Sequence, residues 1–115
     1  MKTMSIASLS RYLIIGGILG IVAGLIHLFS GLTTEFTSII VGDMIFNTLL
    51  GLLSLLAAWL LKNGKQTVLL VIAVEMFGAI VYAFAIGRGV NYFAIIIGAF
   101  LLWQLYSLKN QGELA

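Results

Sequence analysis

Five side chains that can bind a proton, an ion or a hydrogen-bonding partner interrupt long apolar stretches of this sequence: His27, Asp43, Asn47, Glu75 and Gln104. Glu75 is the most isolated of them, because the segment from Val68 to Ile86 contains no other charged residue. An ionised acid in the centre of a membrane costs about 2.5 to 3.5 kcal/mol on insertion scales, so such a residue typically finds a partner or serves a transport pathway. The sequence therefore predicts intramembrane polar or partner contacts at these five positions.

Glu75 can lower this cost in ways that the sequence leaves open. It is protonated and donates a hydrogen bond to a neighbour such as Gln104, or its partner belongs to another subunit or is a transported ion. A cation of the same chain is not expected as the partner, because no Lys or Arg lies at the depth of Glu75.

His27 and Asp43 also allow more than one interpretation. His27 acts as a structural hydrogen bonder, as a proton or metal site, or as a contact to another subunit. Asp43 lies near a membrane boundary, where we expect it to be solvated or to stabilise the start of a helix. The lack of a second histidine argues against haem binding, and the lack of a Glu-x-x-His pair argues against a carboxylate metal centre.

Composition argues against catalysis and against nucleic-acid binding. The chain has no Cys and a single His, and the links between its apolar segments are too short to build a substrate site. We therefore expect no enzyme, no metal and no cofactor, although lipid can bind between the helices. The net charge of +2 is small and dispersed, so nucleic acid is not expected as a partner.

Four apolar segments must position these residues. Of the 115 residues, 62% are hydrophobic and 9% are charged, whereas a soluble domain carries about a quarter charged residues. Each segment has about 18 to 20 residues, enough at ~1.5 Å per residue to cross the ~30 Å hydrocarbon layer. Backbone groups find no partner in lipid, so the segments must be helices. We predict an all-α integral membrane protein with transmembrane helices at about 12–31, 39–61, 66–86 and 90–108.

Short links set the order of these helices. The links at 62–66 and 87–89 allow only tight turns, so the last three helices must run antiparallel to their neighbours. The Asn63-Gly64 pair predicts a left-handed stop after the second helix. Hydroxyl side chains can cap the start of that helix: Thr34, Thr37 or Ser38. No linker separates domains, so we predict a single domain over residues 1–115, with four transmembrane helices in an up-down antiparallel bundle.

Small residues mark the expected packing faces of the first two helices. Gly16, Gly20 and Gly24 follow one another at intervals of four, and Gly17, Gly24 and Gly31 at intervals of seven. Small residues let a neighbouring helix approach closely. A stripe of small and polar residues falls on one face of the second helix: Asp43, Asn47, Gly51, Ser54 and Ala58. We therefore predict glycine-faced helix packing, with a polar side turned towards the bundle interior.

Depth along the helices groups the polar residues into two layers. At ~1.5 Å per residue, His27 on the first helix falls at the same outer level as Asp43 and Asn47 on the second. Glu75 and Gln104 fall about 12 Å above the opposite boundary, with Ser54 or Tyr82 as further candidates. The two layers together nearly cross the membrane.

Basic residues predict the orientation. One side of a four-span chain holds Lys2, Arg11, Lys62, Lys65 and Lys109, and the other side holds Arg88. Lys and Arg are retained on the cytoplasmic side of a membrane. We predict a multi-pass protein of the cell membrane with both termini in the cytoplasm.

Two functions fit these features. The first is a small non-catalytic subunit that scaffolds or stabilises a larger membrane protein complex, with the lipid bilayer and other membrane subunits, or copies of itself, as partners. Its support is the small extramembrane mass, the glycine faces and an acid without an evident partner in its own chain. The alternative is a homo-oligomeric channel or transporter for protons, a cation or a small polar solute, using Glu75 and His27. Its support is the two polar layers, and the sequence favours the first function.

Overall fold

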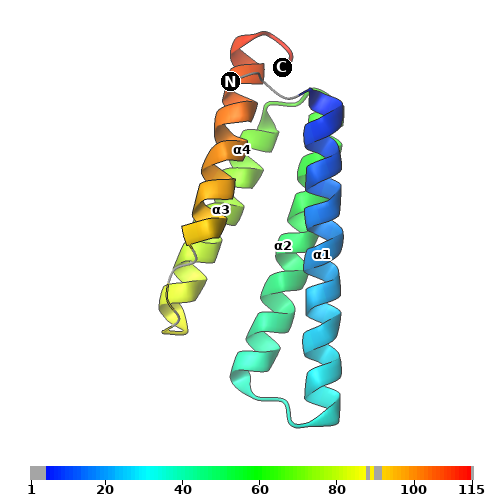
Figure 1. The fold of residues 1–115 in the computed structure, drawn as a ribbon, viewed down its shortest axis with the longest axis vertical. Coiled ribbons are helices and arrows are strands. Elements are labelled where there is room, and N and C mark those ends of the chain that lie inside the picture. The colour runs from blue at the N-terminus through cyan, green and yellow to red at the C-terminus, as the bar shows by residue number, and fades with distance from the viewer. Residues whose placement is uncertain (1–4, 88, 90–91, 115) are drawn as a thin grey trace.

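In the computed structural model of the chain, the described residues form four helices (Figure 1). It describes residues 5–87, 89 and 92–114, together with the side chains of these residues except Phe93. The helices are α1 (Ile6–Thr33), α2 (Ser38–Lys62), α3 (Thr67–Ala85) and α4 (Tyr92–Asn110). Lys2 and Arg88, which entered the orientation argument, lie outside the described residues, as does the predicted start of the fourth helix at residue 90.

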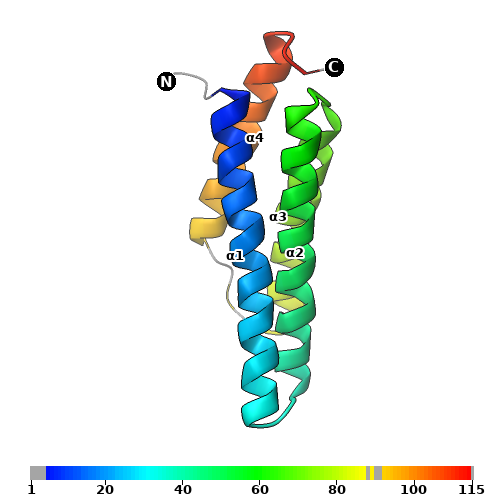
Figure 2. The same cartoon turned by 90° about the vertical axis from the view of Figure 1, so that its right-hand side faces the viewer.

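The helices pack in sequential antiparallel order. In the described part of the chain α1 packs against α2, α2 against α3 and α3 against α4, and no other pair of helix backbones comes together. The start of α1 and the end of α4 lie at the same end of the bundle, called the terminal end below (Figure 1). The α1–α2 hairpin reaches farther than the α3–α4 hairpin at the opposite end, as Figure 2 also shows. The predicted all-α, up-down arrangement is confirmed.

Three of the four helices are long and apolar enough to cross a membrane: Ile6–Thr33, Ser38–Lys62 and Thr67–Ala85. The apolar part of α4, Ala94–Asn110, is shorter. With 28 residues, α1 is roughly 42 Å long and exceeds the ~30 Å hydrocarbon layer, so it tilts or projects from the membrane. These helices, with many large apolar side chains exposed along them, indicate a multi-pass membrane protein in contact with the lipid bilayer.

Local sequence explains where the helices begin and end. The Ser5 hydroxyl accepts the backbone N–H of Ser8 at 3.2 Å, so α1 begins at Ile6. The helix therefore extends about six residues before the transmembrane segment predicted from residue 12, because hydropathy marks the apolar segment and not the cap. Thr37 caps α2 by accepting the N–H of Ile40 at 3.2 Å. Gly64 has a φ of +68°, so it supplies the predicted left-handed stop.

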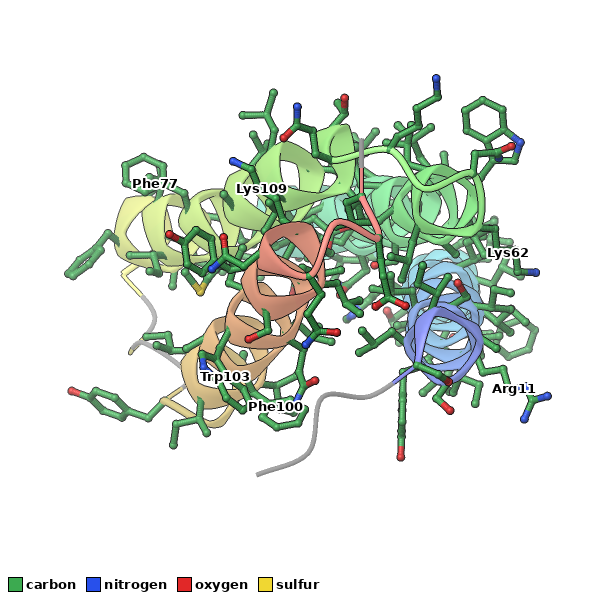
Figure 3. The ribbon with its side chains drawn as sticks, turned by 90° about the horizontal axis from the view of Figure 1, so that it is seen from above. Arg11, Lys62, Phe77, Phe100, Trp103 and Lys109 are labelled. Atoms are coloured by element: carbon green, nitrogen blue, oxygen red, sulfur yellow. The ribbon has the colours of Figure 1, made fainter. Side chains whose placement is uncertain are left out.

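The buried apolar core sits at the terminal end. All four helices and the C-terminal segment contribute to it: Leu9, Leu13, Ala57, Ala58, Leu61, Val68, Ile72, Leu105, Leu108 and Leu114. Arg11 and Lys62 point outwards from this end (Figure 3). Beyond Ile72 none of the described residues of α3 is buried. The bundle is therefore held together at the terminal end and is loosely filled towards the other end.

Glycines bring the backbones of α1 and α2 into contact. A Cβ added at Gly17 would lie 2.8 Å from the carbonyl oxygen of Gly51, and one added at Gly20 would lie 2.9 Å from the Gly51 Cα. A Cβ at Gly24 would lie 3.1 Å from the carbonyl oxygen of Met44. Gly16 does not share this contact, because a Cβ there would meet no atom within 4 Å. Gly17 thus takes the position in the interface that the four-residue spacing assigned to Gly16.

Candidate functional site

Glu75 has a hydrogen-bonding partner within its own chain. The hydroxyl of Ser54 on α2 donates to the Glu75 carboxylate on α3, at 3.0 Å from Oε1 and 3.2 Å from Oε2. Both side chains are half-buried. The expected neighbour Gln104 is fully buried among the residues at the terminal end. The bond between Ser54 and Glu75 joins the two hairpins inside the bundle.

A cavity of about 640 Å³ surrounds this pair. All four helices line it, for example through Leu13 of α1, Leu50 of α2, Ile72 of α3 and Leu101 of α4. Glu75 is the one charged side chain in the described lining. The carboxylate therefore faces a space whose walls are almost entirely apolar.

Asp43 forms a second pair with Tyr82. The Tyr82 hydroxyl donates to Oδ1 of Asp43 at 2.8 Å, and the Tyr82 ring stacks on Phe46 with centroids 4.2 Å apart. Asp43 is 6% exposed, so the expectation of a solvated side chain is wrong. Its position just over one turn inside α2 places its carboxylate against Tyr82 of α3. Tyr82 belongs to this outer pair, since it lies two turns beyond Glu75 on α3.

The second pair lines a smaller cavity of about 230 Å³. Asn47 also lines it, and the Asn47 amide donates to the backbone carbonyl of Asp43 at 2.7 Å. The two cavities have three lining residues in common: Met76, Ala79 and Ala94. They therefore adjoin along α3, with one acid in each.

His27 takes no part in either cavity. It lies half-buried on α1 and makes no hydrogen bond to any residue that the structure describes. The expected outer layer of His27, Asp43 and Asn47 is thus divided. Asp43 and Asn47 share a cavity between α2 and α3, and His27 lies on a different helix outside it. Equal depth did not bring these side chains together.

Metal binding finds no support in the described part of the chain. Within residues 5–87, 89 and 92–114, no group of three or more His, Asp or Glu side chains gathers to hold an ion. The two acids also lie in separate cavities. The chemistry that these acids offer is hydrogen bonding to, or charge pairing with, a group that enters the cavities of the bundle.

Comparison with protein-family models, with curated proteins and with solved structures finds no match to this chain.

Proposed function

We propose that the protein is a small membrane transporter or channel that moves protons, a cation or a small polar solute, with Glu75 as the group that binds the cargo. The observation that carries the proposal is the pair of adjoining cavities. Each contains one acid, and each acid accepts a hydrogen bond from a hydroxyl on a neighbouring helix. Acids inside transmembrane segments typically belong to such pathways.

The arrangement supports movement in two steps. Glu75 and Asp43 lie at different depths, because Ser54 and Asp43 are eleven residues apart on α2, or roughly 16 Å. The residues that line both cavities are Met76, Ala79 and Ala94. A methionine side chain has three rotatable bonds and adapts its shape easily. A cargo released by one acid would thus pass the adaptable side chain of Met76 before it meets the other acid.

Flux through purified protein in liposomes tests the proposal. With proton and monovalent-cation gradients imposed in turn, we expect flux through the wild-type protein and a loss of at least tenfold in Glu75→Gln. Glutamine keeps an acceptor for Ser54 but neither releases a proton nor carries charge. Glu35→Gln is the matched control, because Glu35 is exposed in the α1–α2 link. Equal flux through wild type, Glu75→Gln and empty liposomes would overturn the proposal.

A scaffolding subunit of a larger membrane complex is the second candidate. The observation that favours it is the exposed half of α1 that lies away from the terminal end. Among the described helices, α1 packs against α2 alone. Leu25, Phe29 and Leu32 there are each more than half exposed. The bond from Ser54 removes one earlier argument for this candidate, since Glu75 needs no other subunit as its partner. Extraction in a mild detergent followed by mass spectrometry tests it: unrelated subunits that co-purify support the scaffold, and a pure homo-oligomer contradicts it.

The proposal also includes the orientation of the bundle in the membrane. We propose that the terminal end, with Arg11 and Lys62 at its surface, faces the cytoplasm. Single cysteines at Thr34 and Gln66 lie in exposed links at opposite ends of the bundle. An impermeant thiol reagent should label the first in intact cells and the second only after lysis. Equal labelling of both in intact cells would contradict a single orientation.

A further inference from the structure

The cavity around Glu75 has the size and composition of a small-molecule site. Its volume of about 640 Å³ falls within the roughly 300 to 1,000 Å³ typical of ligand pockets. Such pockets combine an apolar wall with a few polar groups that fix the ligand's orientation. Here the polar groups are the Glu75 carboxylate and the hydroxyls of Ser54 and Tyr12. The cavity therefore suits a mostly apolar molecule with one polar end.

Glu75 defines the chemistry of that polar end. A carboxylate offers about four acceptor sites and, when ionised, no donor. Ser54 supplies a single hydroxyl proton to its two oxygens, so acceptor capacity remains on the side that lines the cavity. The described lining contains no Lys, Arg or His to balance the charge. The complementary group is thus a hydrogen-bond donor with one positive charge.

Aromatic rings flank the same space. Tyr12 of α1 and Phe100 of α4 both line the cavity, and Trp103 packs beside Phe100 with centroids 6.3 Å apart. Figure 3 shows Phe100 and Trp103 next to each other on α4. Aromatic rings bury a large apolar surface. Tyr12 and Phe100 therefore extend the apolar wall along which a hydrocarbon chain can lie.

The cavity opens sideways, between α1 and α4. The backbones of these two helices do not pack together in the described part of the chain. Some of their lining residues are exposed, with Tyr12 at 61% and Ile97 at 44%, whereas Ile72 of α3 is 2% exposed. Leu9 and Leu13 belong to the buried core and close the terminal end. A ligand therefore reaches Glu75 from the lipid.

We propose that this cavity binds a lipophilic amine in its ammonium form, taken up from the bilayer between α1 and α4. The ammonium group contacts the Glu75 carboxylate, and the hydrocarbon part lies along the apolar walls and the two flanking rings. This inference rests on the proposed function and names the class of cargo. A neutral lipid chain in the same space is the competing occupant.

Equilibrium binding to the full chain in phosphatidylcholine nanodiscs tests the inference. The probes are octylamine, octanol and octanoate, which share one chain length and differ in the charge of the polar end. The fluorescence of Trp103 reports occupancy in a Trp59→Phe background, because Trp103 packs beside Phe100, which lines the cavity. We expect saturable binding of octylamine, binding of octanol weaker by about tenfold or more, and no binding of octanoate.

Two variants locate the site, each with a matched control. Glu75→Gln should weaken octylamine binding by about tenfold or more, whereas Glu35→Gln in the exposed link should leave it unchanged. Gly16→Leu places a side chain in the cavity where a Cβ meets no atom within 4 Å, so it should block binding without disturbing the fold. Ile18→Phe adds bulk on an exposed part of α1 and should not. Helicity measured by circular dichroism shows that each variant is folded.

The outcomes separate this inference from the proposed function. Octylamine that binds no better than octanol, or equally well to Glu75→Gln and Gly16→Leu as to the parent, would overturn the amine site. Loss of flux in Glu75→Gln together with that result would leave transport standing with another cargo. Tight, Glu75-dependent binding of octylamine without flux of octylamine, protons or monovalent cations through the same liposomes would support the site and overturn transport.

Discussion

The α1–α2 and α3–α4 hairpins have similar apolar sequences, yet they use glycine in opposite ways. In α1–α2 the glycines let one backbone touch the other, as at Gly17 and Gly51. In α3–α4 a Cβ at Gly98 would meet the side chain of Met76, 2.7 Å from its sulfur, and a Cβ at Gly78 would meet nothing within 4 Å. Backbone contact leaves little freedom, whereas a flexible side chain over a glycine can shift. The packing within the α1–α2 hairpin is therefore rigid, whereas the packing within the α3–α4 hairpin can adjust.

Asp43 and Glu75 both lie where the two hairpins meet, a region called the joint below. Asp43 belongs to α2 and binds Tyr82 of α3, whereas Glu75 belongs to α3 and binds Ser54 of α2. Because the apolar core is confined to the terminal end, these two polar pairs connect the hairpins where buried apolar contacts are few. Regions with few buried contacts open most easily. The comparison therefore predicts large effects for substitutions within α1–α2 and smaller, localised effects at the joint.

The largest effect is expected from Gly17→Leu. Its Cβ would lie 2.8 Å from the Gly51 carbonyl oxygen and 2.8 Å from the side chain of Leu55. Backbone cannot move aside as a flexible side chain can, so we expect a loss of about 3 kcal/mol or more in the free energy of unfolding. Titration with sodium dodecyl sulfate in mixed micelles, followed by circular dichroism, measures the change.

Gly78→Leu in α3 is the matched control for this change. It makes the same substitution at a helical glycine where a Cβ has open space. We expect the stability to stay constant or to rise by less than about 1 kcal/mol, because leucine favours helix more than glycine does. Equal losses in the two variants would show that the hairpins do not differ in the way described.

A smaller effect is expected from Tyr82→Phe. Phenylalanine keeps the stacking on Phe46 but removes the hydroxyl that donates to Asp43 at 2.8 Å. Interhelical hydrogen bonds in membranes contribute about 0.6 kcal/mol on average and about 1.7 kcal/mol at most, so for this short bond we expect a loss near the upper value by the same detergent titration. Tyr92→Phe, at an exposed position, should change nothing. A Tyr82→Phe protein as stable as its parent would remove the outer pair from the joint.

Hydropathy and linker length were sufficient to predict the four helices and their order. They could not predict that α1 begins at Ile6, because the cap depends on a single hydrogen bond from Ser8 to Ser5. Nor could periodicity decide between two overlapping glycine sets. Gly16 and Gly17 are adjacent, and the choice between them depends on the rotation of α1 against α2, which Gly51 and Leu55 determine.

The sequence predicted which residues belong to the site better than it predicted which of them form hydrogen-bonded pairs. Glu75 and Asp43 stood out because a carboxylate in an apolar segment is costly. Ser54 was a candidate at the depth of Glu75, but Tyr82 was assigned to that same layer and pairs with Asp43 instead. Depth also carries no information about which helix faces which. His27 shows the same limitation of depth as a predictor. It was predicted at the depth of Asp43, yet it lies outside both cavities. Sequence gives height along a helix, and lateral position comes from packing.

The smallest effect is expected from Ser54→Ala, which removes the inner link between the hairpins. The Ser54 hydroxyl lies 3.0 and 3.2 Å from the two Glu75 oxygens, farther than Tyr82 lies from Asp43, so this bond is the weaker one. Interhelical hydrogen bonds in membranes contribute about 0.6 kcal/mol on average, and we expect a loss of this size in the detergent titration. A double-mutant cycle with Glu75→Leu, which removes the acceptor, should give a coupling energy of about the same size. Ser107→Ala on α4 is the control, because its hydroxyl donates to no residue that the structure describes. If Ser54→Ala cost as much as Gly17→Leu, the joint would be as rigid as the first hairpin, and the contrast between the two halves would fail.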